Sequence, residues 1–133
     1  MKVDGECHCG AITYEAVVDP EQVAICHCTD CQQLSGTAYR TVVPAPSTTF
    51  RLLTGEPRKY TKTAESGAKR IHAFCADCGT PIYSSAVSAP PTYNLRLGTI
   101  RQRAELTPKR QNWCRSAQSW AMNLQHIPRF DRV

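Results

Sequence analysis

The densest group of reactive side chains in this sequence is a C-x-C-x-x-C segment formed by Cys26, Cys28 and Cys31. It places three thiols within a few residues of one another. Three soft sulfur ligands on one short segment suit a tetrahedral Zn²⁺ whose fourth coordination position stays free, and that ligand count is typical of a catalytic zinc site. The segment therefore predicts an open metal centre.

Two further cysteine pairs lie near the start of the chain and past its middle. They are Cys7 with Cys9, and Cys75 with Cys78. Four sulfurs complete a tetrahedral zinc site, and a metal that joins such distant residues closes a long loop, which stabilises a fold. We expect a structural metal here. Cys114 remains outside both sites, as a free thiol or, preferably, as a small buried side chain.

The length of 133 residues predicts a single domain over 1–133. Eight cysteines would also suit a secreted disulfide protein, but the first residues contain no apolar segment typical of a secretion signal. We therefore expect a reducing, cytoplasmic environment, in which these spacings favour metal binding over disulfides.

The formal net charge of +5 counts every cysteine as neutral. Zinc ligands are deprotonated, so seven thiolates and two Zn²⁺ ions would leave a net charge of about +2. This mildly basic balance favours a small acidic ligand over a nucleic acid. No apolar run approaches the roughly 20 residues that span a bilayer, so we expect no membrane insertion.

Short β-branched and aromatic stretches separated by turn residues predict a mainly β fold. Pro44 and Pro46 are expected to end one strand, and a single helical turn is expected over 32–36. A short C-terminal helix is expected over 116–124, before Pro128. The predicted strands cover 11–18, 23–25, 38–43, 49–53, 58–62, 69–74 and 93–97.

Alternation along extended chain separates the cysteines from the histidines between them. Cys7 and Cys9 would point to one side and His8 to the other, and His27 would likewise point away from its neighbours, as a supporting or surface group. His72 is expected to be a partly exposed strand residue on the face opposite Ile71 and Ala73. Gly79, directly after the C-x-x-C pair, allows the tight turn of a zinc knuckle.

The ordered series of C-x-C, C-x-C-x-x-C and F-C-x-x-C-G-T resembles the glutathione-dependent formaldehyde-activating enzyme family, which also includes proteins of the centromere protein V type. The resemblance extends over nearly the whole chain, to Trp113, Trp120 and the segment 127–130. One departure is Gln111-Asn112, where the family usually has His-Ile. If this segment lines the substrate site, the native substrate differs from the nominal one.

The resemblance implies antiparallel sheets folded as a β-tent around two zinc ions. Cys7, Cys9, Cys75 and Cys78 would hold the structural ion. Cys26, Cys28 and Cys31 would hold a more labile catalytic ion and form the catalytic site of a carbon–sulfur lyase. The implied reaction adds glutathione to formaldehyde and gives S-hydroxymethylglutathione, although another thiol or aldehyde suits the same open site. The oligomeric state stays open.

Several side chains have two interpretations. Arg40, Lys62 and Arg96 are candidate cations for the glutathione carboxylates. Asp30 could orient a proton or simply occupy a turn. The aromatic residues Tyr39, Trp113 and Trp120 could line a pocket, although the core is expected for large aromatics.

The rival hypothesis is a non-catalytic zinc module that binds protein or nucleic acid. It requires a fourth ligand for the central cysteines, and the candidates are His27, Asp30 and His126.

Overall fold

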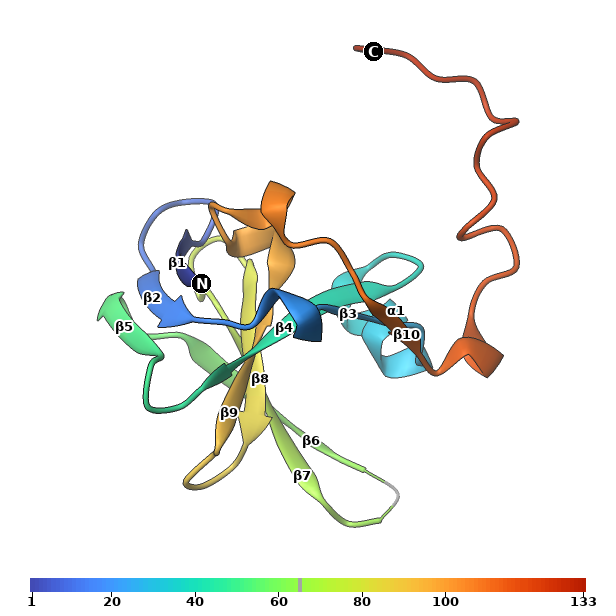
Figure 1. The fold of residues 1–133 in the computed structure, drawn as a ribbon. Coiled ribbons are helices and arrows are strands. Elements are labelled where there is room, and N and C mark those ends of the chain that lie inside the picture. The colour runs from blue at the N-terminus through green and yellow to red at the C-terminus, as the bar shows by residue number, and fades with distance from the viewer. Residues whose placement is uncertain (65) are drawn as a thin grey trace.

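The computed structural model describes residues 1–64 and 66–133, and it confirms a mainly β fold with two sheets (Figure 1). A three-stranded sheet has the order β1-β2-β5, and a seven-stranded sheet has the order β10-β3-β4-β9-β8-β7-β6. The three-stranded sheet contains β1 (Lys2–Glu6), β2 (Thr13–Val17) and β5 (Arg51–Thr54). The seven-stranded sheet contains β3 (Ala24–Cys26), β4 (Arg40–Pro46), β6 (Arg58–Thr63), β7 (Lys69–Phe74), β8 (Pro81–Ala86), β9 (Thr92–Arg96) and β10 (Arg110–Asn112).

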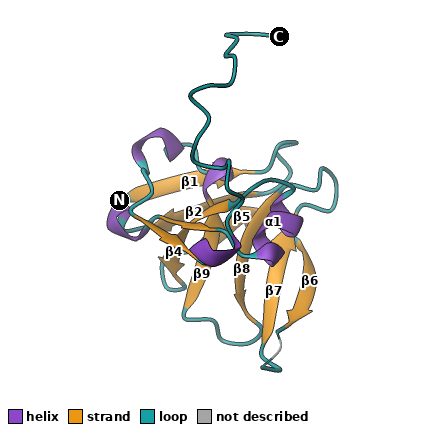
Figure 2. Ribbon diagram, turned by 90° about the vertical axis from the view of Figure 1, so that its right-hand side faces the viewer, coloured by secondary structure: helices purple, strands orange, loops and turns teal. Residues whose placement is uncertain are grey.

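The helical elements are short. The α-helix α1 (Thr29–Ser35) follows β3, and Figure 2 shows it beside the seven-stranded sheet. Single 3-10 turns complete the described residues, at η1 (Pro20–Gln22), η2 (Leu97–Thr99), η3 (Arg103–Glu105) and η4 (Cys114–Ser116). No helix in the described ranges is long and apolar enough to cross a membrane.

The core contains apolar side chains from both sheets. Tyr14 of β2 is fully buried, and its hydroxyl lies 2.7 Å from Oγ1 of Thr99. Val43 and Leu95 contribute from the seven-stranded sheet. The Phe50 ring stacks on an aromatic neighbour in that sheet, Tyr93, at a centroid distance of 4.5 Å. The strong β propensity of these side chains explains why their segments form strands.

The strand β4 continues through both of its prolines, so the prediction that they end the strand is wrong. β4 pairs with β3 only as far as Val42, and beyond that point β9 is its only partner among the described strands. Pro44 and Pro46 are two residues apart, so both backbone nitrogens face the side of β4 that has no partner strand. An edge of this kind tolerates proline because no ladder hydrogen bond is lost.

Two further expectations differ from the structure. Strand β10 pairs in parallel with β3, whereas purely antiparallel sheets were expected. The predicted C-terminal helix over 116–124 is also wrong, since only the turn η4 forms near its start. Gln118 still contacts Gln32 of α1 and Ala121 is buried, and the end of the chain then extends away from the body of the protein (Figures 1 and 2). Without a continuous surface to pack on, a helix as short as the predicted one is not stable.

Candidate metal centres and ligand site

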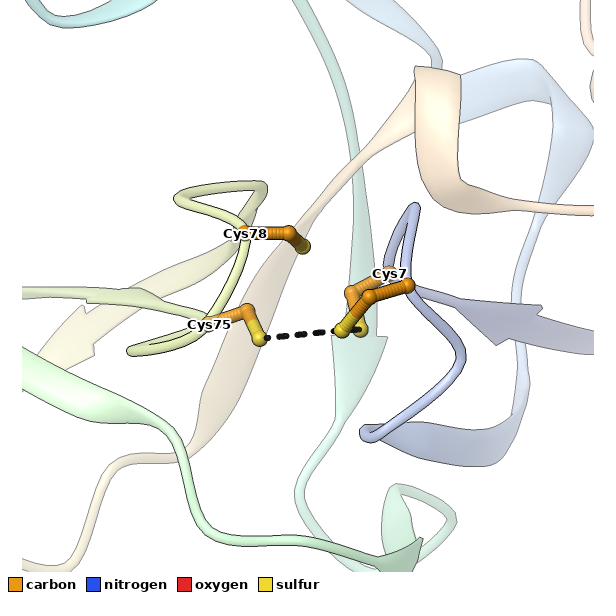
Figure 3. Close-up of side chains that lie close together, drawn as sticks. Cys7, Cys75 and Cys78 are labelled. Carbon is orange, nitrogen blue, oxygen red and sulfur yellow. Dashed lines mark hydrogen bonds between the residues drawn. The ribbon is translucent and has the colours of Figure 1, made fainter.

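The four-sulfur cluster joins two tight turns. Cys7 follows β1 in a turn closed by a hydrogen bond from the Gly10 amide to the Cys7 carbonyl, with an N···O distance of 3.1 Å. Cys75 and Cys78 lie on the turn after β7 and face Cys7 (Figure 3). Gly79 adopts a φ of 78° there, and its amide donates to the Cys75 carbonyl. This conformation favours glycine, as the zinc-knuckle prediction required.

The sulfur positions of this cluster fit a zinc ion. The Sγ atoms of Cys7, Cys9, Cys75 and Cys78 all lie within 4.8 Å of one another. The Sγ atoms of Cys7 and Cys9 are 3.6 Å apart, and those of Cys9 and Cys75 are 3.8 Å apart. Four sulfurs placed about 2.3 Å from a tetrahedral Zn²⁺ would be about 3.8 Å from one another. The two turns thus hold the geometry of a closed four-sulfur site.

The central cluster lies where β3 passes into α1. Cys26 ends β3, Cys28 caps the N-terminus of α1, and Cys31 lies in its first turn. The Cys28 sulfur accepts a hydrogen bond from the Cys31 amide at 3.3 Å. Gly36 ends the helix with a φ of 71°, in a left-handed conformation typical of a C-cap. The N-terminal cap therefore fixes the position of Cys31 relative to Cys28.

The donor set of the central cluster suits a soft divalent cation. Its three sulfurs lie within 4.8 Å of one another. Burial, together with the neighbouring Cys28 thiol, raises the pKa of Cys31 to about 12. Three such close thiols resist ionising together, and a divalent cation removes that penalty because it binds thiolates. This chemistry fits zinc.

The three candidate fourth ligands are placed elsewhere. Asp30 forms an ion pair with Lys62, which lies on β6. His126 is exposed on the C-terminal segment. His27 directs Nε2 toward Oε1 of Gln111, at 2.7 Å. Within the described ranges, the ligand group of the central cluster contains only its three cysteines.

His27 is a supporting residue inside the protein. It is 1 % exposed, so the surface alternative is wrong. Its ring meets the Tyr39 ring edge-on, with the centroids 5.5 Å apart, and its amide donates to the Asn112 carbonyl at 3.0 Å. Gln111 and Asn112, the residues that depart from the family pattern, therefore contact the residue between Cys26 and Cys28. Sequence reasoning missed this role, because no local signal indicates the pairing of β10 with β3.

The strand register places the central cluster and several polar residues on one face of the seven-stranded sheet. Cys26 is directly opposite Arg40, and Arg96 is opposite Val42. Opposed residues point to the same side, and so do residues two apart on a strand. Cys26, Arg40 and Arg96 therefore share a face. The next pairs, Asn94 with Ser84 and Ser84 with His72, extend that face across the sheet.

His72 is half-buried on this polar face, as its alternation with Ile71 and Ala73 predicted. Its Nδ1 lies 3.2 Å from an NH2 nitrogen of Arg96. Burial first, and then the Arg96 charge, lower the pKa of His72 to about 4. The ring is therefore neutral at pH 7, and Nδ1 accepts the hydrogen bond.

Two cavities meet at the buried arginines. The larger, of about 970 Å³, is lined by Tyr39, Cys7 and the 97–99 turn, among others. The smaller, of about 370 Å³, is lined by His72 and Tyr60, among others. Arg40, Arg96 and Pro81 line both cavities. The sulfurs of the central cluster line neither cavity. Arg40 is the cross-strand partner of Cys26 and lines both cavities, so it lies between the cluster and this space.

The remaining candidate residues divide between two environments. Tyr39 is half-buried and lines the larger cavity, whereas Trp113 and Trp120 are 55 % and 54 % exposed. The core assignment of both tryptophans is therefore wrong. Cys114 is also exposed, which contradicts the preferred buried position, and its thiol donates to the Gln111 carbonyl at 3.6 Å.

Comparison with known proteins agrees with this arrangement. The family model described as glutathione-dependent formaldehyde-activating enzyme matches residues 2–116. A Schizosaccharomyces pombe protein described as an uncharacterized lyase is 30 % identical over 91 residues, which are 68 % of this chain. The chain spans 62 % of the length of that relative.

A solved structure shares the fold. It is a crystal structure of a Rhodobacter sphaeroides protein, with a TM-score of 0.63 and 19 % identity, and the match covers 82 % of this chain and 99 % of the other. The family match extends over most of the chain and includes all seven clustered cysteines. This chain belongs to the glutathione-dependent formaldehyde-activating enzyme family.

Proposed function

We propose that this protein is a cytoplasmic zinc enzyme with a β-tent fold that adds glutathione to formaldehyde, or joins a related thiol and aldehyde. The observation that carries the proposal is the three-sulfur cluster of Cys26, Cys28 and Cys31, to which no described histidine or carboxylate adds a fourth ligand. Family membership supports a lyase-type activity. Cys7, Cys9, Cys75 and Cys78 would hold a second, structural zinc.

In the proposed reaction, the glutathione sulfur forms a bond to the formaldehyde carbon and the carbonyl π bond breaks. The thiol proton ends on the former carbonyl oxygen, so the product is S-hydroxymethylglutathione with no other co-reactant. A zinc ion with an open position lowers the pKa of a bound thiol and polarises a carbonyl oxygen.

The protein's own residues would position the reactants. Cys26, Cys28 and Cys31 are held by the β3–α1 junction, and Lys62 fixes the first turn of α1 through Asp30. Arg40 and Arg96 supply positive charge on the same polar face, which suits a ligand with a carboxylate. Tyr39 adds an aromatic wall to the larger cavity.

Exchange NMR between free glutathione and its hydroxymethyl adduct tests the reaction directly. The zinc-loaded protein should speed the exchange, and Cys28→Ser should return it to the uncatalysed rate. Cys114→Ser is the matched control, because Cys114 lies outside the cluster, and it should keep full activity. Binding of glutathione without faster exchange would leave a thiol-binding zinc protein and refute the formaldehyde reaction.

A further inference from the structure

Two buried guanidinium groups lie side by side, and no carboxylate of the described residues forms an ion pair with either. Arg40 of β4 is 6 % exposed and Arg96 of β9 is 7 % exposed, and β4 and β9 are neighbouring strands. The ion pairs of the described residues involve other basic groups, namely Arg51, Lys62, Arg101 and Lys109. A buried charge is costly unless an opposite charge or hydrogen bonds compensate it. An anionic ligand bound at this pair would therefore compensate charge that no carboxylate of the described residues compensates.

Arg96 is held in one orientation while part of its guanidinium stays free. One NH2 nitrogen donates to His72 Nδ1 at 3.2 Å, and the other lies 3.4 Å from the Asn94 carbonyl oxygen. The buried Nε has no hydrogen-bond partner. Nε itself is enclosed, but Arg96 lines both cavities, so a ligand there lies next to a guanidinium group that the described residues pair only in part. A planar fork with fixed geometry recognises a carboxylate better than a single charge does.

The groups around the arginine pair leave an excess of positive charge. Arg40 and Arg96 contribute two positive charges, and His72 is neutral. Lys62 and Asp30 neutralise each other. Three thiolates around one Zn²⁺ carry one negative charge, and they lie beside Arg40 because Cys26 is its cross-strand partner. One positive charge remains before a ligand binds, which favours an anionic ligand.

The spacing between the arginines and the metal cluster suits one small ligand. β4 lies between β3 and β9, so Arg96 is two strand spacings from Cys26. Along the strands it is offset by two residues, because Cys26 is opposite Arg40 and Arg96 is opposite Val42. Strand spacing and rise place their Cα atoms about 12 Å apart. The long arginine side chain shortens the distance that a ligand must span. A thiol and a carboxylate separated by one or two residues would meet both ends.

We infer that Arg40 and Arg96, with Arg96 oriented by His72, form a carboxylate subsite for a thiol ligand whose sulfur binds at the Cys26–Cys28–Cys31 cluster. The inference rests on the proposed function for the thiol, and it assigns the carboxylate end of the ligand to two named residues. Lys62, the third candidate cation, is engaged by Asp30 and is not part of this subsite.

The test measures binding of three thiols to the zinc-loaded full chain by calorimetry. They are glutathione and two analogues, each with one of its two carboxylates converted to an amide. The analogue that lacks the carboxylate bound by the arginine pair should bind roughly tenfold more weakly than glutathione, as expected for loss of a charge-assisted bidentate contact. In Arg96→Gln and in Arg40→Gln, glutathione and that analogue should bind alike. Arg96→Lys should restore only part of the difference, because lysine keeps the charge and loses the fork.

Arg70→Gln is the matched control, because Arg70 lies on the same sheet face but outside both cavities. It should keep the full difference between glutathione and the analogue. If both arginine variants also keep that difference, the subsite does not exist. If either variant fails to fold, the Nε–H NMR signals of the unmodified protein decide: they should shift with glutathione and stay unchanged with the analogue.

The subsite and the reaction can fail separately. Charge-dependent binding without faster exchange would retain the subsite and remove the formaldehyde reaction. Faster exchange with equal affinity for all three thiols would retain the reaction and remove the subsite.

Discussion

The carboxylate of Asp30, in the first turn of α1, forms an ion pair with the ammonium group of Lys62 on β6. The pair ties the short helix that carries Cys31 to the far edge strand of the seven-stranded sheet. Its side chains are 45 % and 30 % exposed, so its contribution to the free energy of unfolding should be below about 1 kcal/mol. Its importance lies in the charge that it places beside the central cysteines.

Lys62→Gln should weaken metal binding at the central cluster by a fewfold and leave folding nearly unchanged. The Asp30 carboxylate, followed by the charges of Cys28 and Cys31, raises the pKa of Lys62, so the ammonium group lies within electrostatic reach of these sulfurs. Its loss leaves the acidic Asp30 unbalanced beside three thiolates. Chelator competition measures the change, and Lys59→Gln, on the opposite sheet face, is the control. Equal metal retention in both variants would contradict the prediction.

The two metal centres should differ in how firmly they hold their ions. The four-sulfur site satisfies all positions of a tetrahedral ion, whereas the central site supplies three ligands. Mild chelation should therefore remove one zinc and leave the fold intact. Metal analysis with circular dichroism would detect this. Simultaneous loss of both ions with unfolding would show that the sites are not divided in this way.

The same division predicts different effects of two substitutions. Cys75→Ser removes a buried ligand from the site that joins the turns after β1 and β7, so it should cost several kcal/mol or prevent folding. Cys31→Ser should give a folded protein with weak central metal and little activity. Thermal unfolding of both variants, compared with Cys114→Ser, distinguishes these outcomes. Similar loss of stability for both would refute the assignment.

Gly5→Ala should destabilise the junction of the two sheets by about 1–3 kcal/mol. A Cβ atom at Gly5 would lie 2.3 Å from the Tyr14 ring, whose hydroxyl contacts Thr99. The ring is buried and cannot move away freely. Gly98→Ala is the matched control, because a Cβ atom there meets no heavy atom within 4 Å. Urea unfolding should separate the two variants, and equal midpoints would exclude the clash.

His72 should make stability fall as the pH decreases from about 6.5 to about 4. Its pKa is about 4 in the folded protein and 6.5 ordinarily, so the unfolded chain takes up a proton first. The contribution is complete above pH 6.5 and lost below pH 4. Half exposure reduces it to about 1–2 kcal/mol. His72→Gln keeps an acceptor for Arg96 and cannot titrate, so on acidification the protein with His72 should lose about 1–2 kcal/mol of unfolding free energy relative to the variant. Parallel pH curves would contradict this.

The grouping of the central cysteines was predictable because the information is local. Cys26, Cys28 and Cys31 are close in the sequence, and a turn and a helix start bring their sulfurs together with little dependence on the rest of the chain. The faces of Ile71, His72 and Ala73 followed from strand alternation alone. α1 is longer than the single turn expected over 32–36, because the Cys28 cap lets it begin at Thr29, and Gly36 ends it as the C-cap.

The features that were missed depend on which distant segments meet. β1 contains Asp4, Gly5 and Glu6, residues with weak strand propensity, and it forms because β2 pairs with it. Likewise, the contact of Gln111 with His27 follows from a parallel pairing between segments far apart in the sequence. No local pattern encodes such a pairing. The proximity of Arg40 to Arg96 became visible only from the register of β4 with β9.

The parallel position of β10 also has a consequence for synthesis on the ribosome. β3, which carries Cys26, can pair with β4 as soon as the first half of the chain has emerged, but its other edge stays open until Arg110–Asn112 leave the exit tunnel. Only then can the His27 amide donate its hydrogen bond to the Asn112 carbonyl. A nascent chain would therefore have its central cysteines in place while the adjoining strand edge is still bare, and a chaperone or a metal donor could act during that interval.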